Sequence, residues 1–176
     1  MALVLDGTTG IVSANIADGT ISASDLASGA ITSAALPAGS VVQVVTTSSG
    51  TQIVSFTQQT WVDTPFTVSI TPKSVNNKIL LNFTSWGLLN NNQYAGIRIL
   101  RGSTRVSQHW TYHNRDEAWN GVMNFSVSGV DVPASLTEVT YKIQIYTSYN
   151  TPAFYFNYGG ADSLQMAHLT AMEVAG

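Results

Sequence analysis

The side chains with the greatest capacity for chemistry gather in one stretch of the chain, from Arg98 to Trp119. Four of the seven basic residues lie there, together with tryptophan, tyrosine, histidine and acidic side chains. The set is Arg98, Arg101, Arg105, His109, Trp110, Tyr112, His113, Arg115, Asp116, Glu117 and Trp119. Aromatic rings give large contact areas at low entropic cost, and guanidinium and carboxylate groups form hydrogen bonds in fixed directions. This mixture suits the recognition of a sugar.

We therefore expect this stretch to form a loop that presents a glycan-binding surface. The residues expected to contact the ligand are Trp110, Tyr112, His113, Arg115, Asp116 and Trp119. A second interpretation stays open, in which the arginines pair with carboxylates across an interface between subunits. The same choice between ligand contact and packing applies to the tryptophans, which we expect at or near strand ends and loops. They are Trp61, Trp86, Trp110 and Trp119.

The same stretch does not favour metal binding or catalysis. His109 and His113 have the spacing of a zinc-binding helix, but Trp110 stands where H-E-x-x-H has its glutamate. In an extended segment these histidines would lie about 13 Å apart. No G-x-S-x-G motif is present, and Asp116 and Glu117 are neighbours that would point opposite ways in a strand. We expect no metal, no cofactor and no enzymatic activity, although a carboxylate pair assembled between subunits stays open.

The overall composition restricts the partners. Only 10% of the 176 residues are charged, against a usual share of about 25%, and the net charge is −3. Nucleic acid is not expected as a partner, because phosphate binding needs clustered Lys and Arg. There are no cysteines, which excludes disulfides and thiolate metal sites. The residues after Met1 do not resemble a signal peptide, and no stretch is apolar enough for membrane insertion.

From Ser40 onward, apolar and polar residues alternate with the period of a β-strand. The alternating runs fall at residues 41–47, 66–70, 79–83, 97–99, 123–127, 139–145, 154–158 and 164–174. Turn-forming clusters separate them, at residues 48–50, 76–77, 90–92, 128–129 and 159–160. We expect eight to ten short strands in two antiparallel sheets, with a jelly roll as the preferred topology and an immunoglobulin-type sandwich as the alternative. His168, in the last strand, is expected to be a hydrogen-bonded interior or interface residue.

The first part of the chain has a different pattern of apolar residues. Between Thr8 and Val42 a large aliphatic residue recurs at every fifth position, and a small residue stands two positions before each one. The aliphatic residues are Ile11, Ile16, Ile21, Leu26, Ile31, Leu36 and Val41. A period of five forms no stripe on an α-helix, and in a straight strand it sends successive side chains to opposite faces. The chain must therefore bend within each unit, or wrap around other copies of itself.

One aliphatic side chain in five buries too little surface to offset the backbone entropy that ordering this segment costs. We therefore expect residues 1–40 to be a shaft that is ordered only beside other chains, and residues 41–176 to be a separate β-sandwich head. A closed symmetric bundle is the simplest assembly. The expected shaft contacts are Ile11, Ile16, Ile21, Leu26, Ile31 and Leu36.

The shaft sequence ANIADGTISASDLASGAIT resembles the decad repeats, of the form A-D-G-T-I-T-x-x-x-L, in the N-terminal shafts of bacteriophage fibre and other virion surface proteins. The segment GSVVQVVTTSSGTQIVSFTQQTWVDTPFTVSITPKSVNNKILLNF is similar to the start of the compact β-domain that often follows such shafts. The ending HLTAMEV resembles the usual final strand of those domains. One departure is that only residues 1–7 precede the repeat, so the repeat itself would serve as the anchor.

The resemblance implies an all-β homotrimer with a head similar in outline to tumour-necrosis-factor-like jelly rolls. It also implies a place on the virion surface, after synthesis in the bacterial cytoplasm, with the N-terminal segment contacting other virion proteins. Two functions follow as expectations. In the first, a tail or head fibre binds a polysaccharide on the host cell. In the second, a decoration or cement protein stabilises the capsid and binds no receptor.

Overall fold

The computed structural model describes residues 20–28, 30–32, 35–51, 53–54, 59–89, 93–113, 121–148, 155–157 and 166–176. The chain divides into two units, Met1–Leu36 and Pro37–Gly176. All the described strands belong to the second unit.

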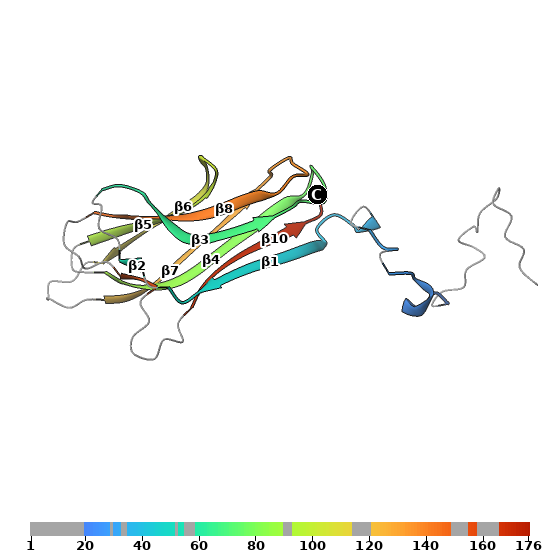
Figure 1. Ribbon diagram of the computed structural model, residues 1–176, viewed down its shortest axis with the longest axis horizontal. Coiled ribbons are helices and arrows are strands. Elements are labelled where there is room, and N and C mark those ends of the chain that lie inside the picture. The colour runs from blue at the N-terminus through green and yellow to red at the C-terminus, as the bar shows by residue number, and fades with distance from the viewer. Residues whose placement is uncertain are drawn as a thin grey trace, which may run out of the picture. The chain divides into compact units, whose positions relative to one another are not determined.

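The second unit consists of two antiparallel sheets (Figure 1). Sheet A contains the long strands β1 (Val41–Ser49), β10 (Ala167–Val174), β4 (Lys78–Leu89) and β7 (Gly121–Asp131), in that order. The short strand β9 (Tyr155–Phe156) also pairs with β4, and β2 (Ile53–Val54) pairs with β9. Sheet B has the order β3 (Val62–Ile70), β8 (Val139–Thr147), β5 (Gln93–Arg101) and β6 (Thr104–His113).

The pairing of the eight long strands defines a jelly roll. In chain order the first strand pairs with the last (β1 with β10), the second with the seventh (β3 with β8), the third with the sixth (β4 with β7) and the fourth with the fifth (β5 with β6). This nested pairing is that of one long hairpin rolled into two sheets. The expected all-β jelly-roll sandwich is confirmed, and the immunoglobulin-type alternative is wrong.

The hydrophobic core lies between the sheets, and the period-two alternation supplies it. The inward residues of both sheets are almost fully buried, and Phe66 of sheet B and Phe83 of sheet A meet with ring centroids 5.4 Å apart. The buried cluster consists of Phe66, Val68, Ile70, Ile79, Leu81, Phe83, Ala95, Ile97, Ile99, Phe125, Val127, Tyr141, Ile143, Ile145, Ala167, Leu169 and Ala171. These positions fall within the runs that the sequence predicts as strands, apart from Ala95.

An ionic and hydrogen-bonded clamp joins the two sheets at one end. Asp131, the last residue of β7, accepts hydrogen bonds from Arg101 Nε at 2.6 Å and from Tyr141 Oη at 2.8 Å. Both donors belong to sheet B. Burial, together with the hydrogen bond to Asp131, raises the pKa of Tyr141 well above its ordinary value, so Tyr141 keeps its proton and remains a donor. Arg101 thus has a structural role, and its hydrogen-bond acceptor belongs to the same chain.

Two sequence-based expectations about this unit are wrong. The stretch from Arg98 to His113 is not a loop, since it forms a β5–β6 hairpin that turns at Gly102, where φ is +58°. The expected turn at Ser128–Gly129 lies inside β7. The glycine marks a close approach between the sheets, because a Cβ atom on Gly129 would lie 2.8 Å from Cβ of Ser107.

Two of the tryptophans differ from expectation, and His168 is hydrogen-bonded, as expected, but does not lie in the interior. Trp86 and Trp110 lie within β4 and β6, not at strand ends, while Trp61 directly precedes β3. His168 is exposed on the outer face of sheet A, where Nδ1 lies 2.8 Å from Ser48 Oγ, so it is not an interior residue. Trp119 lies outside the described residues.

The first unit contains a turn in each described pentad. The backbone amides of Asp25, Ala30 and Ala35 each donate to the carbonyl oxygen three residues earlier, at 3.0, 2.9 and 2.9 Å. These residues are five apart, and the first turn belongs to a short 3-10 helix, Ala23–Asp25. The next amide in the series, that of Ser40, donates to Pro37 at 3.1 Å. The turns show a bend within each described unit, which is one of the two possibilities that the period of five left open.

These turns leave the large aliphatic side chains in contact with solvent. Ile21, Leu26 and Ile31 are 56%, 43% and 57% exposed, and Leu36 is half-buried. Ile11 and Ile16 lie outside the described residues. The segment from Thr20 to Thr32 therefore has no hydrophobic core of its own among the residues that the structure describes.

Candidate ligand-binding site

Four aromatic side chains from four parts of the chain meet on the outer face of sheet B. We call Trp61, Tyr94, Trp110 and Tyr146 the aromatic platform. The strand register brings them together, because Trp110 of β6 and Tyr146 of β8 both lie opposite Gly96 of β5, on either side of it. Tyr94 is two residues from Gly96 on the same face, and Trp61 enters from the start of β3.

The four rings form one connected cluster. Trp110 lies 5.2 Å from Tyr146, 5.5 Å from Trp61 and 5.6 Å from Tyr94, measured between ring centroids. Trp61 is also 5.4 Å from Tyr146. Most of these pairs are tilted or edge to face, which is the favourable arrangement for aromatic quadrupoles. The rings therefore hold one another in place with no ligand bound.

Gly96 permits this packing. A Cβ atom at this position would lie 2.7 Å from Cζ3 of Trp110 and 2.7 Å from Cη2 of Trp61. Real Cβ atoms do not approach other carbons so closely. The two indole rings thus rest on the backbone of β5, in space that any other residue would occupy.

Part of the cluster faces solvent. Tyr94 and Trp110 are 41% and 44% exposed, and the neighbouring Tyr112 is 56% exposed. A shallow depression of about 170 Å³ is lined by Tyr94, Trp110, Thr111 and Tyr112. Exposed aromatic surface with ring edges fixed from below is suited to stacking against a flat apolar face of a ligand, such as one face of a pyranose ring.

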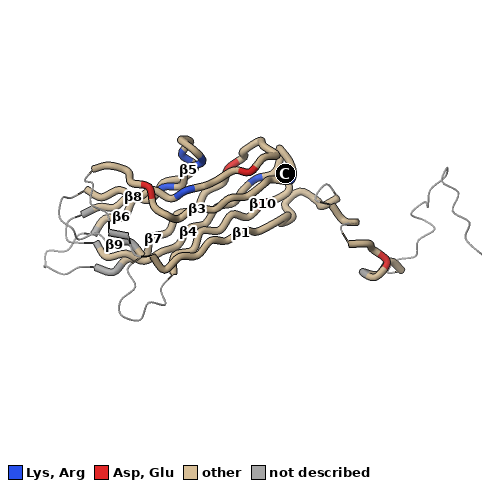
Figure 2. Tube along the Cα trace, viewed as in Figure 1, with Lys and Arg blue, Asp and Glu red and all other residues tan. Residues whose placement is uncertain are grey.

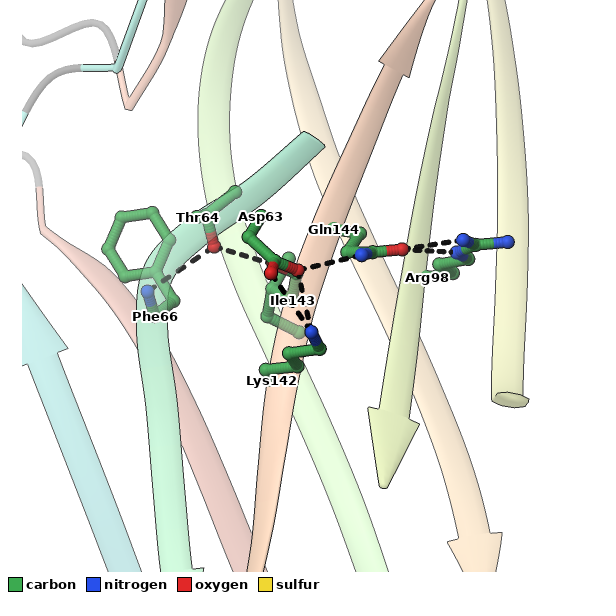
Figure 3. Close-up of polar contacts among 7 residues, drawn as sticks. All are labelled: Asp63, Thr64, Phe66, Arg98, Lys142, Ile143 and Gln144. Carbon is green, nitrogen blue, oxygen red and sulfur yellow. Dashed lines mark hydrogen bonds and ion pairs between the residues drawn. The ribbon is translucent and has the colours of Figure 1, made fainter. Parts of the chain in front are cut away.

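A chain of polar side chains runs beside the platform on the same face (Figure 3). Arg98 donates to Oε1 of Gln144 through Nε at 2.8 Å and through a terminal nitrogen at 2.6 Å. Gln144 in turn donates to Asp63 at 2.7 Å, and Lys142 Nζ lies 2.9 Å from the same carboxylate. The guanidinium carbon of Arg98 lies 4.1 Å from the ring centroid of Trp61, so this network touches the platform directly.

The side chains of this network are in their charged forms at neutral pH. Hydrogen bonds from Lys142 and Gln144 lower the pKa of Asp63, which keeps the carboxylate ionised at neutral pH. Burial beside the platform and repulsion from Arg105 both lower the pKa of Arg98. The ordinary pKa of a guanidinium is so high that Arg98 stays charged. The site therefore offers a cation, a carboxylate and an amide beside exposed rings.

The structure brings together only part of the predicted ligand set. Trp110 and Tyr112 lie on β6 and share its outward face. His113 is the last residue of β6, and its side chain, with the whole of Arg115, Asp116 and Trp119, lies outside the described residues. His109 lies opposite Ile97 and therefore on the other face of the sheet from Trp110.

Tyr94 and Tyr146 were not predicted as site residues, and for Trp61 the sequence left the choice between packing and ligand contact open. The sequence did contain one indication of the site, because Tyr146 lies on the solvent-facing side of β8 together with Lys142 and Gln144. An aromatic side chain on the exposed side of a strand can indicate a binding site. The other three rings come from β5, β6 and the residue before β3, so the sequence does not show that they are neighbours. Among the residues that the structure describes, no group of three or more His, Cys, Asp or Glu side chains could hold a metal ion.

Comparisons with known proteins give no family. No family model matches the sequence, and no curated protein matches it. Among solved structures, the VP2 subviral particle of infectious bursal disease virus is similar over 76% of this chain and 33% of its own, with 12% identity and a TM-score of 0.39. The Gx strain of infectious bursal disease virus is similar over 76% of this chain and 37% of its own, with 13% identity and a TM-score of 0.35. The present chain thus spans about a third of the length of these chains.

Within the part of the chain that the structure describes, no helix is long and apolar enough to cross a bilayer.

Proposed function

We propose that this chain is a non-enzymatic structural protein of the surface of a bacteriophage virion. In this proposal the N-terminal repeat assembles three copies and contacts other virion proteins, and the jelly-roll head binds a glycan on the host cell. The observation that carries the proposal is the turn in each described pentad, which leaves Ile21, Leu26 and Ile31 exposed. These residues belong to the part of the sequence that resembles fibre shafts.

The exposed aliphatic side chains support assembly. A single copy loses backbone entropy at every turn and leaves about half of the surface of Ile21, Leu26 and Ile31 in contact with solvent. Copies related by a rotation axis along the shaft would bury these side chains against their equivalents. A closed bundle of three is the assembly that the resemblance implies.

The aromatic platform supports glycan binding. Its rings are ordered by one another, so a ligand would meet a surface whose entropy is already reduced. Arg98, Gln144 and Asp63 supply hydrogen-bond donors and acceptors beside it. The hydroxyl–imidazole pair of Ser48 and His168, 2.8 Å apart, lies on the outer face of sheet A and not at the platform, which fits binding at the platform better than hydrolysis.

Replacing Trp110 with alanine should abolish measurable attachment to host cells without changing the oligomeric state. Removal of a central aromatic anchor typically costs about 2 kcal/mol or more, a loss of about 30-fold in affinity. Trp119→Ala is expected to act in the same way. Binding of the purified protein to host cells and to host polysaccharide, with the molar mass from light scattering, tests both variants.

The matched control for these variants is Leu136→Ala. Leu136 is 60% exposed in the connection between β7 and β8, away from the platform, and its replacement should leave attachment unchanged. Unchanged attachment by both tryptophan variants would exclude the platform and the stretch around Trp119 as the receptor-binding surface.

The position of the protein on the particle tests the virion assignment. A label on the head should decorate a fibre or the tail in electron micrographs of purified particles. An icosahedral lattice of label would instead identify a capsid decoration protein, and glycan binding by the purified protein would then be absent. Complete absence of label from particles would contradict both functions.

A further inference from the structure

We infer that the outer face of sheet A is a contact surface between copies of this chain. This inference rests on the proposed trimer and adds the surface through which the heads meet. The face in question is the solvent side of β1, β10, β4 and β7, opposite the side that packs on sheet B.

An unbroken row of apolar side chains crosses this face from one edge to the other. The strand register pairs Val44 with Met172, Met172 with Leu80, and Leu80 with Val130, so the four side chains are neighbours on successive strands. Val44, Leu80 and Val130 are 51%, 39% and 59% exposed, and Met172 is half-buried. Directly neighbouring cross-strand apolar residues on a solvent face cost solubility unless something covers them.

A row of uncharged polar residues lies next to the apolar row. Thr46 pairs with Thr170, Thr170 with Asn82, and Asn82 with Ser128. Between the two rows runs a groove of about 530 Å³, which β4, β7 and β10 line with Leu80, Asn82, Ser128, Val130, Thr170 and Met172. The face thus offers both projecting side chains and a depression, and both donors and acceptors of hydrogen bonds.

The outer face of sheet A carries fewer charged residues than the outer face of sheet B. Among the described outward-facing residues of the long strands of sheet A, Lys78 at the start of β4 is the one charged side chain. β1 carries no charged residue along its whole length (Figure 2). Sheet B, in contrast, bears the Asp63, Lys142 and Arg98 network on its outer face. Depletion of charge at the centre of a surface is typical of an interface between subunits.

These features select a second copy as the occupant. An uncharged surface has no electrostatic attraction for nucleic acid or for an acidic or basic partner. Val44 projects from the edge strand β1, outside the groove that β10, β4 and β7 line, so the β1 edge of one copy can lie in the groove of the next. The hydroxyl and amide row can form hydrogen bonds with polar groups of the neighbouring copy, because each group both donates and accepts.

The repeat leads into β1 at one end of sheet A. The chain enters β1 directly from the repeat, and the amide of Gly39 donates to the carbonyl of Ala175 at the end of β10, at 2.8 Å. Both strands belong to sheet A. Copies joined through the repeat would therefore have their sheets A tethered at one end, where the local concentration of the partner is high.

The size of the face explains why a tether is needed. Four strands about 4.8 Å apart, over about six residues of about 3.3 Å each, cover roughly 400 Å² of flat surface. A stable interface buries about 800 Å² on each partner. The face by itself is thus smaller than a typical stable interface, so the contact between heads depends on the tether through the repeat.

Cysteine labelling of the full chain tests this inference. The chain contains no cysteine, so Val130→Cys and Thr67→Cys each introduce a unique thiol. Thr67 is exposed on the outer face of sheet B and serves as the matched control. In the assembled protein, a maleimide attached to a bulky polymer should modify Val130→Cys at least about 10-fold more slowly than Thr67→Cys, and equally fast in denaturant. Val44→Cys should be protected in the same way as Val130→Cys.

The outcomes separate this inference from the proposed function. Light scattering on each variant first establishes whether the chain is assembled. An assembled chain in which Val130→Cys and Val44→Cys both react as fast as Thr67→Cys overturns the contact surface and leaves the trimer intact. A monomeric chain of the unmodified sequence overturns the proposed trimer and the contact surface with it.

Discussion

Replacing Glu173 with glutamine should lower the free energy of unfolding by about 3 kcal/mol, which is among the largest effects expected from one substitution in this chain. Glu173 lies on β10 and is fully buried. One carboxylate oxygen accepts from Gln43 Nε2 at 2.5 Å, and the other accepts from the Lys73 amide at 2.6 Å and from Asn77 Nδ2 at 2.7 Å. Glutamine has one acceptor oxygen, so its amide nitrogen would face a buried donor.

The substitution should act on several segments together. The carboxylate of Glu173 joins β10 to β1 through Gln43 and to the turn before β4 through Lys73 and Asn77, and Asn77 also accepts from the Gly176 amide at 3.2 Å. Urea unfolding followed by tryptophan fluorescence measures the loss. Glu138→Gln is the control, because Glu138 is exposed between β7 and β8 and should change stability by less than about 0.5 kcal/mol. Equal stability of the two variants would mean that the buried hydrogen bonds contribute nothing net.

The pH dependence of stability gives an independent measure of the same carboxylate. Burial works to raise the pKa of Glu173, but the hydrogen bonds from Asn77, Gln43 and two backbone amides outweigh it and lower the pKa below 4.5. The group is then protonated more readily in the unfolded chain than in the folded one. Its stabilisation is present above about pH 4.5 and is lost as the pH falls through the lowered value. The stability difference between the unmodified chain and Glu173→Gln should therefore shrink below pH 4.5.

The sequence predicts most of the sandwich because most strands have one buried and one exposed face. In β3, β8 and β10 the burial alternates residue by residue, as the sequence alternates. β6 was missed because it is an edge strand whose described residues are all exposed or half-buried, so no period-two pattern of burial is imposed on them. Because none of its described residues is buried, the sequence of β6 resembles that of a loop.

The site is less predictable than the fold, because its residues are adjacent only through strand register. Trp110 and Tyr146 are 36 residues apart and become neighbours across Gly96 when β6 and β8 both pair with β5. Glu173 and Gln43 are separated by 130 residues. For Glu173 the sequence did hold a signal, since it continues the inward phase of Ala167, Leu169 and Ala171. A carboxylate in a buried phase predicts a hydrogen-bonded partner set, but not which residues supply it.

Gly96→Ala should destabilise the head by about 1–3 kcal/mol and weaken glycan binding as strongly as Trp110→Ala does. The added methyl group would lie 2.7 Å from both Trp110 and Trp61, and neither ring can move without breaking its contact with Tyr146. The platform would therefore be displaced from β5. The change should be visible in the near-ultraviolet circular dichroism of the tryptophans and in binding to host polysaccharide.

Two comparisons determine whether the rings cause this effect. Gly50→Ala is the matched control, because a Cβ atom at Gly50 would meet nothing within 4 Å, and stability and binding should stay unchanged. In the Trp110→Ala background, Gly96→Ala should cost less stability than it does alone, since one of the two clashing rings is then absent. An equal cost in both backgrounds would show that the constraint at Gly96 comes from the backbone of β5 and not from the platform. The glycine would then be unrelated to the binding surface, and only the contacts between the rings would hold the platform in place.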